Sequence, residues 1–182
     1  MKKIASLFAR SGAILTRDYH PDALWVVNGQ GVATRKWDGT AVRVKGGKIY
    51  ARYDAKGGKP WPPGFEPCQE PDPITLHQPG WVEANRPEDK WIRAAADGSV
   101  WQDGTYEACG PRIGGNAEGL LSHVLLRHGD HVLDDVPRDY DGLVAYFTEH
   151  NIEGVVWWRD PACVDCDKIK ITGAALGVRR RK

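Results

Sequence analysis

Short apolar runs closed by glycine or proline turn signals dominate this chain. Residues 40–45 alternate between apolar and polar positions, and Gly46-Gly47 then leads into residues 48–54, which predicts a β-hairpin. The same signals predict further strands over residues 23–28, 31–37, 104–109, 153–158 and 167–171, with a turn at Asn28-Gly29. The pattern is mainly that of antiparallel β-structure.

Two segments have a helical pattern instead. Pro87 opens a predicted helix that Asp97-Gly98 stops. A second helix is predicted over 137–150, where one apolar face is formed by Tyr140, Leu143, Val144 and Phe147. Strands joined by hairpins, with a few intervening helices, indicate an α+β fold with antiparallel sheets flanked by helices.

The composition is that of a soluble globular protein. The chain has 182 residues, of which 27% are charged and 41% are hydrophobic, so we expect a single domain over residues 1–182. No apolar run reaches membrane-spanning length, and no apolar signal core follows the basic N-terminus, so we expect a cytoplasmic protein with no membrane partner. The 25 basic and 24 acidic side chains nearly cancel, so a nucleic-acid site must be a local patch.

The cysteines and histidines leave a metal alternative open. Cys163-x-x-Cys166 is half of a zinc site, but Cys68 and Cys109 stand far apart, and free thiols in a turn before a strand are favoured. His123, His128 and His131 lack metal-ligand spacing, and a position on the surface or at a pocket rim is favoured for them.

An ordered set of charged residues carries the candidate chemistry. It begins with Lys36-Trp37-Asp38-Gly39 and continues with Arg52, Glu107, Glu153, Lys168 and Lys170. The first four residues alone match an ordinary strand that ends in an Asp-Gly turn. Lysines, an arginine and two glutamates in this order are what a site for polyphosphate and metal requires.

The residue types fit a nucleophilic lysine. Freeing the amine of an ordinary lysine at pH 7 costs roughly 4.6 kcal/mol, so neighbouring cations or partial burial must assist it. Arg35, Arg52, Lys168 and Lys170 are candidate cations. Lys168 and Lys170 lie two apart on a predicted strand, so they share one face; a solvated strand face is the alternative. Glu153 precedes an apolar strand, and its carboxylate suits Mg²⁺.

The order of motifs resembles the covalent nucleotidyltransferase superfamily of DNA ligases, RNA ligases and capping enzymes. The resemblance is carried by K-W-D-G at 36–39, the stretch 104–129, E-G-V-V-W-W at 153–158 and D-K-I-K-I at 167–171. It covers roughly residues 20–176 and is greatest to the small ATP-dependent 5′–3′ RNA ligases.

The resemblance implies a nucleotidyltransferase (ATP-grasp-like) fold and an RNA ligase that joins 5′-phosphate and 3′-hydroxyl ends. Lys36 would carry AMP covalently, and Glu153 would serve a Mg²⁺ or Mn²⁺ ion. Glu107 would contact either a water bound to that metal or the nucleotide ribose. Residues 122–129 would form a wall of the purine pocket. The ATP-binding set it implies is Lys36, Asp38, Gly39, Arg43, Arg52, Glu107, Glu153, Lys168 and Lys170.

The sequence departs from the family in two places. Position 41 is alanine where ligases often carry an arginine, and Arg43 follows two residues later. The chain ends 12 residues after Lys170, so we expect neither an appended oligonucleotide-binding barrel nor a helical domain.

Several functions and roles remain open. The alternatives are an end-adenylylating or GTP-using capping enzyme that does not seal, and a nucleotide-binding module that has lost catalysis. The proline-rich segment 55–80, which carries Lys56, Lys59 and Trp61, is predicted to be a loop that holds RNA ends or forms plain surface. The tail from Arg179 to Lys182 is predicted to be a solvated basic run, and no obligate protein partner is evident.

Overall fold

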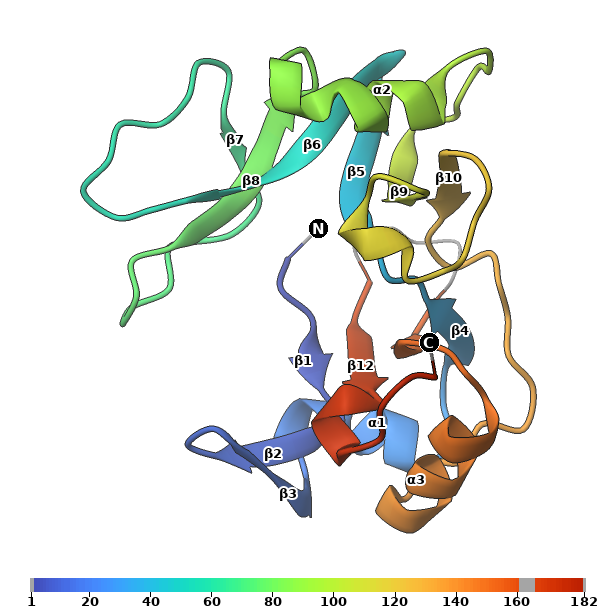
Figure 1. Cartoon of the computed structure of the whole chain (residues 1–182). Helices are drawn as coiled ribbons and strands as arrows, with labels where there is room; N and C mark the ends of the chain where they lie inside the picture. The colour runs from blue at the N-terminus through green and yellow to red at the C-terminus, as the bar shows by residue number, and fades with distance from the viewer. Residues whose placement is uncertain (1, 161–165, 182) are drawn as a thin grey trace. The chain divides into compact units, whose positions relative to one another are not determined.

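The structure is a computed structural model that describes residues 2–160 and 166–181. It is a mixed α+β protein with several antiparallel sheets and few helices, which confirms the predicted class (Figure 1). The chain forms two compact units: unit 1 comprises Met1–Lys3 and Asp38–His128, and unit 2 comprises Ile4–Trp37 and Gly129–Lys182. The single nucleotidyltransferase domain over 1–182 stays a prediction.

Unit 1 is built on a six-stranded antiparallel sheet in the order β10-β9-β5-β6-β8-β7. The predicted hairpin is present, because β5 pairs with β6 across Gly46 and Gly47, which both have positive φ. The strands are β5 (Thr40–Lys45), β6 (Lys48–Ala55), β7 (Glu66–Pro67), β8 (Gln78–Glu83), β9 (Gly104–Cys109) and β10 (Val124–Arg127).

The core of unit 1 lies on one face of this sheet. The predicted helix at Pro87 forms as a short η2 (Pro87–Asp89) that continues into α2 (Lys90–Ala96), which crosses this face (Figure 1). Ile92 of α2 packs with Val42, Ala51 and Tyr106 from three strands. Because side chains alternate along a strand, the opposite face carries the polar residues of the same strands.

Unit 2 contains a four-stranded sheet in the order β1-β12-β11-β4. Its central strand β11 pairs antiparallel with both β4 and β12, while β1 pairs parallel with β12. The predicted second helix forms as α3, and the core of the unit includes Leu143, Phe147, Val155 and Trp157. The elements are β1 (Ala5–Ser6), β2 (Phe8–Ser11), β3 (Ile14–Tyr19), β4 (Val32–Lys36), α3 (Tyr140–Glu149), β11 (Gly154–Trp158), β12 (Lys168–Thr172) and η4 (Ala174–Leu176).

The strand predicted over residues 23–28 is wrong. The chain there forms η1 (Pro21–Ala23) and α1 (Leu24–Val27). His20 caps the first turn by accepting the backbone N–H of Asp22, and Pro21 occupies a favourable first-turn position. Trp25 and Val26 are adjacent yet both buried, which the period of a helix allows and the alternation of a half-buried strand does not.

Two other segments differ from the sequence expectation. The predicted loop 55–80 contains β7 and the first residues of β8, which pair with each other. The basic tail is not simply solvated, because Arg181 and Asn151 exchange two hydrogen bonds and the Arg181 guanidinium donates to the Glu149 carbonyl at the end of α3. No helix in the described part of the chain has the length and apolar character to span a membrane.

Candidate functional site

Lys36 and Glu153 form an ion pair in unit 2. Lys36 is the last residue of β4, directly opposite Gly154, the first residue of β11. The Lys36 Nζ atom lies 2.5 Å from Glu153 Oε2, and each side chain is about one-quarter exposed, at 25% and 23%. A Cβ at position 154 would collide with the Ile171 carbonyl oxygen, so glycine lets the strands approach closely beside this pair.

Lys168 and Lys170 lie on the same sheet face as Lys36. Directly opposed residues of antiparallel strands project to one face. Trp158 is opposite Lys168, Val156 is opposite Lys170 and Gly154 is opposite Lys36, with these three β11 positions alternating along the strand. Ile169 and Ile171 are buried on the other face, so the predicted division of β12 into a lysine face and an isoleucine face is confirmed.

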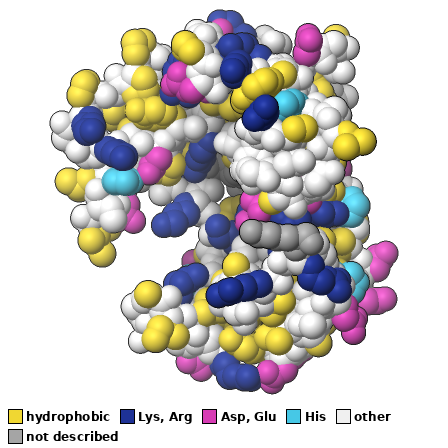
Figure 2. Space-filling model, viewed as in Figure 1, with side chains coloured by type: hydrophobic (Ala, Val, Ile, Leu, Met, Phe, Trp, Pro, Cys, Tyr) yellow, Lys and Arg dark blue, Asp and Glu magenta, His cyan; other side chains and the backbone are white. Residues whose placement is uncertain are grey.

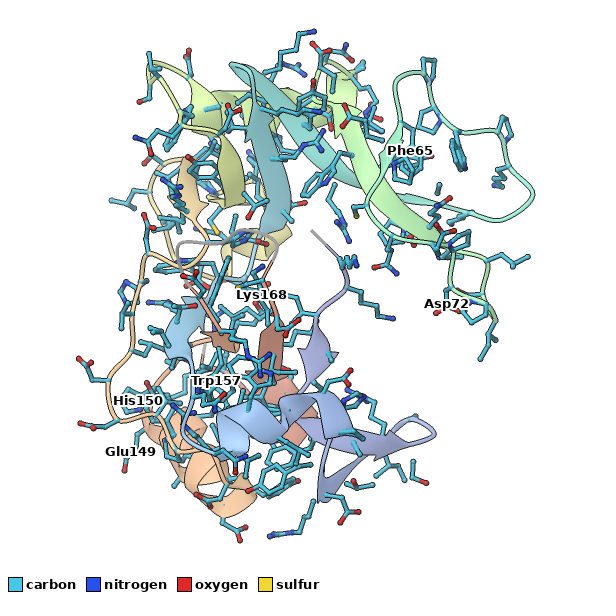
Figure 3. All side chains as sticks on the ribbon, turned by 180° about the vertical axis from the view of Figure 1, so that it is seen from behind. Phe65, Asp72, Glu149, His150, Trp157 and Lys168 are labelled. Carbon is cyan, nitrogen blue, oxygen red and sulfur yellow. The ribbon has the colours of Figure 1, made fainter. Side chains whose placement is uncertain are left out.

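The Lys168 side chain has two defined contacts. Its ammonium donates a hydrogen bond of 3.2 Å to the Cys166 carbonyl and lies 4.2 Å from the centre of the Trp158 ring. In Figure 3, Lys168 lies at one end of the sheet, and Trp157 lies within the packed side chains of unit 2. The indole therefore holds one of the candidate phosphate-binding cations in place.

The expectation that Arg35 is one of the cations beside Lys36 is wrong. Arg35 is opposite Val155, a core residue, so it projects from the face opposite to Lys36. Its guanidinium lies 3.9 Å from the centre of the Trp37 ring, and Trp37 packs edge-on against His131. Strand alternation separates the side chain of Arg35 from that of Lys36 although the two residues are adjacent in sequence.

Asp38 and Gly39 belong to unit 1, so the chain passes between the units within the Lys36-Trp37-Asp38-Gly39 motif. The backbone N–H of Asp38 donates a hydrogen bond of 2.9 Å to the Glu118 carboxylate. Gly39 packs so closely on the Ala108 carbonyl and Cys109 that any side chain would collide. The packing therefore leaves room only for glycine at this position of the motif.

Sequence reasoning missed Glu118. It follows η3 (Gly114–Asn116) in a glycine-rich stretch, and Gly114 approaches the Asp38 carbonyl closely enough that a Cβ would lie 3.5 Å away. An acidic residue in a glycine-rich loop between two motifs was the available signal, but its partner is a backbone N–H 80 positions away.

Glu107 of unit 1 pairs with His128. Glu107 Oε2 lies 2.9 Å from His128 Nε2, and the side chains are 13% and 16% exposed. The His128 Nδ1 atom is buried and has no hydrogen-bond partner among the described residues. His128 is thus a partner of a candidate site residue rather than a plain surface histidine.

The three histidines have separate partners. His123 stacks on Trp91 and accepts the Arg112 backbone N–H, His128 contacts Glu107, and His131 packs on Trp37. The described residues contain no group of three or more His, Cys, Asp or Glu side chains placed to bind a metal.

Arg43 and Arg52 share the polar face of the unit 1 sheet with Glu107. Arg43 donates to Glu66 at 2.7 Å, and its guanidinium lies 4.6 Å from the centre of the Tyr50 ring. Arg52 lies 5.1 Å from the centre of the Trp81 ring and donates to the Cys68 thiol at 3.0 Å. Ala41 is opposite Glu107, and Arg43 follows two positions later on β5, so Arg43 and Glu107 project from the same face of the sheet.

Glu66 is an anion fixed by cations. The hydrogen bond from Arg43 holds the pKa of the Glu66 carboxyl below its ordinary value, and Lys45 at 3.4 Å adds to this effect. Arg43 therefore anchors β7 to β5, a role that the sequence did not indicate.

Comparison of the sequence with models of known protein families and with curated proteins finds no match. The function must therefore be argued from the chemistry of these two clusters.

The carboxylates suit a hard divalent cation only in part. Magnesium typically uses one or two protein carboxylates and takes its remaining ligands from water and substrate phosphates. Glu153 in unit 2 and Glu107 in unit 1 each offer such an oxygen, and each already contacts a basic side chain. Each carboxylate by itself is too small a donor set for a resident structural ion.

The cysteine pair lies partly outside the described residues, because Cys163 falls in the stretch 161–165. Cys166 is a free cysteine whose thiol donates to the Asp160 carbonyl at 3.1 Å, and Cys68 and Cys109 are also free.

Proposed function

We propose that this protein is an ATP-dependent RNA ligase that joins 5′-phosphate and 3′-hydroxyl ends through a lysyl-AMP intermediate on Lys36. The observation that carries the proposal is on one sheet face of unit 2: Lys36 is paired with Glu153, and Lys168 and Lys170 project from the same face of β12, on the other side of β11. A nucleophile, a carboxylate and two cations on one face of a sheet are the groups that attack on a nucleoside triphosphate requires.

In the first step, Lys36 Nζ attacks the α-phosphorus of ATP. The Lys36 ammonium must first lose one proton to become a nucleophilic amine, and Glu153, within hydrogen-bond distance of that nitrogen, is the proposed acceptor. The P–N bond then forms, the P–O bond to pyrophosphate breaks, and the nitrogen gives a second proton to water or to the departing pyrophosphate. Lys168 and Lys170 stabilise the negative charge on the phosphates. A divalent cation bound with the nucleotide would neutralise further phosphate charge.

The next two steps transfer AMP and seal the RNA. An oxygen of the RNA 5′-phosphate attacks the phosphorus of lysyl-AMP, so the P–N bond breaks and a 5′-5′ pyrophosphate forms. The RNA 3′-hydroxyl then attacks the activated 5′-phosphorus, AMP leaves, and a 3′–5′ phosphodiester remains. The ATP-binding roles of Asp38, Gly39, Arg43, Arg52 and Glu107 belong to this proposal.

The decisive experiment is the mass of the protein after incubation with ATP and Mg²⁺. A gain of one adenylate, mapped by peptide sequencing to Lys36, supports the proposal. Parallel reactions with α-labelled ATP and GTP distinguish it from a capping enzyme, and joining of labelled RNA distinguishes it from an enzyme that only adenylylates ends. Lys48→Ala, a lysine on the surface of unit 1 paired with Glu83, is the matched control for Lys36→Ala. Label that persists in Lys36→Ala contradicts the proposal.

A further inference from the structure

Three aromatic rings form a ladder from β6 into the loop that follows it. Tyr53 packs edge-on against Phe65 at 6.0 Å between ring centres, and Phe65 packs against Trp61 at 5.1 Å. Arg86 lies 5.5 Å from the centre of the Tyr53 ring. In Figure 3, Phe65 lies against the strands of its unit, away from the turn that carries Asp72.

The ladder is tightly seated at its inner end. A Cβ at Gly80 of β8 would collide with the Phe65 ring, so the absence of a side chain there makes room for Phe65. Phe65 also donates its backbone N–H to the Pro62 carbonyl, which closes a turn next to Trp61. The outer ring is therefore supported by both a side-chain contact and a defined turn.

Trp61, in contrast, remains 54% exposed. A tryptophan ring that is not packed exposes a large apolar area to water, which is unfavourable in free energy. A ring that is held in place but not covered is preorganised to stack on a planar ligand.

The charges around Trp61 favour an anionic ligand. Three of the four acidic side chains between Asp54 and His77 are engaged: Asp54 with His77, Glu66 with Arg43, and Asp72 with the backbone N–H groups of its own turn. The fourth, Glu70, is exposed and lies nine positions after Trp61, whereas Lys59 lies two positions before it. Lys56 and Lys59 are exposed and form no ion pair among the described residues. Figure 2 shows basic and hydrophobic side chains next to each other over this loop.

We propose that Trp61 stacks on an unpaired base of the RNA substrate while Lys56 and Lys59 contact the adjacent phosphates. This inference rests on the proposed function for its choice of RNA. Every base has a π-face for stacking, but only an unpaired base exposes it, so the site favours single-stranded RNA over a duplex. The loop thus gives the protein a surface for single-stranded RNA.

The test is fluorescence anisotropy of a short 5′-phosphorylated RNA titrated with the full chain. Trp61→Ala is expected to weaken binding about tenfold, whereas Trp61→Phe keeps a ring and most of the affinity. The logarithm of the binding constant falls as the logarithm of the salt concentration rises, and the double change Lys56→Ala and Lys59→Ala is expected to make this negative slope shallower by about 1.4. Ile74→Ala, which truncates a 90% exposed apolar residue of the same segment, is the matched control and keeps wild-type affinity.

The outcomes separate the inference from the proposed function. Self-adenylylation of the wild type requires no RNA and tests the ligase assignment alone. If the wild type is adenylylated on Lys36 and binds RNA, but Trp61→Ala binds as tightly, the Trp61 site is overturned and the ligase assignment stands. Equal binding of an RNA duplex with the same dependence on Trp61, or no binding of RNA by the wild type, also overturns the site.

Discussion

The ammonium nitrogen of Lys36 and the carboxylate oxygen Oε2 of Glu153 lie 2.5 Å apart, although 117 positions separate the two residues in the chain. The β4–β11 pairing creates this proximity, because Lys36 ends one strand opposite the residue that follows Glu153. The pair joins the proposed nucleophile to a group that can hold its proton.

Neutralising Glu153 tests this relationship. Glu153→Gln keeps the size of the side chain and removes its negative charge, so it loses both the proton acceptor and the carboxylate for the cation. We expect the rate of self-adenylylation to fall about 10²-fold or more, with folding retained. Quench-flow measurement of label incorporation gives the rate, and circular dichroism checks the fold. A rate within a factor of three of the wild type would exclude Glu153 from the first step.

The two faces of β12 predict opposite phenotypes for neighbouring residues. Lys168→Ala or Lys170→Ala is expected to lower self-adenylylation about 10²-fold while thermal stability changes little. Ile169→Ala deletes a core side chain that is 2% exposed, so it is expected to lower the free energy of unfolding by about 2–5 kcal/mol. Thermal melts and labelling of the three variants check the contrast. Near-full activity of both lysine variants would exclude them as phosphate ligands.

Glu118 is expected to position the turn that follows Lys36, the proposed nucleophile. Glu118→Ala leaves the backbone N–H of Asp38 without its carboxylate partner. We expect the first step to slow about tenfold, which corresponds to the lower end of the free-energy cost of losing one hydrogen bond to a charged group. Glu118→Gln keeps an acceptor oxygen and is expected to restore most of the rate. Comparison of kcat and KM for ATP in both variants is the measurement. Equal rates for glutamine and alanine would show that the hydrogen bond does not matter.

The Glu66 ion pair predicts an acid-sensitive anchor for segment 55–80. Arg43 lowers the pKa of the Glu66 carboxyl in the folded protein, so the pair stabilises the fold above the ordinary glutamate pKa of about 4.3. This stabilisation is lost as the pH falls through the lowered folded-state pKa. We expect hydrogen exchange in the segment to show an acid-induced increase that Glu66→Gln removes. The same acid response in both proteins would assign it to other carboxyl groups.

Sequence patterns predicted those elements whose local signals and tertiary environment agree. The alternation in 40–45 and 167–171 became strands with the expected faces, because each strand has one buried side. The strand predicted over 23–28 overlooked a local signal, the cap and first-turn proline at His20 and Pro21. A tertiary contact adds to it, because the Arg138 guanidinium donates to the carbonyls of Val26, Gln30 and Gly31 and secures the end of α1, and a long-range contact of this kind leaves no local signal.

The candidate site was predictable in its charged residues and not in their partners. The order of motifs indicated Lys36, Glu153 and the β12 lysines, which the structure places on neighbouring strands. The contacts of Glu118 with Asp38 and of His128 with Glu107 depend on how loops fold over the sheet. Strand alternation alone, applied to adjacent residues, would have separated Arg35 from Lys36.

Lys36 variants separate the steps of the proposed reaction. Lys36→Ala removes the atom that would carry AMP, so covalent labelling and net joining from ATP must vanish. Lys36→Arg is expected to fail at the same step, because a guanidinium remains protonated and is no nucleophile. Sealing does not use the covalent lysine; it requires an activated 5′-adenylylated end and a 3′-hydroxyl held in line. Lys36→Ala is therefore expected to join pre-adenylylated RNA, more slowly if the amine also contacts phosphate.

Gel analysis of 5′-phosphorylated and pre-adenylylated RNA with the wild type and both variants measures this separation. Lys48→Ala serves as the control and is expected to join both substrates, because its ammonium pairs with Glu83 on the sheet of the other unit. Failure of Lys36→Ala on pre-adenylylated RNA that the wild type joins would mean that the lysine also acts in sealing. Formation of a covalent adenylate by Lys36→Ala would place the nucleophile at another residue, because an alanine side chain has no nitrogen that could bond to phosphorus.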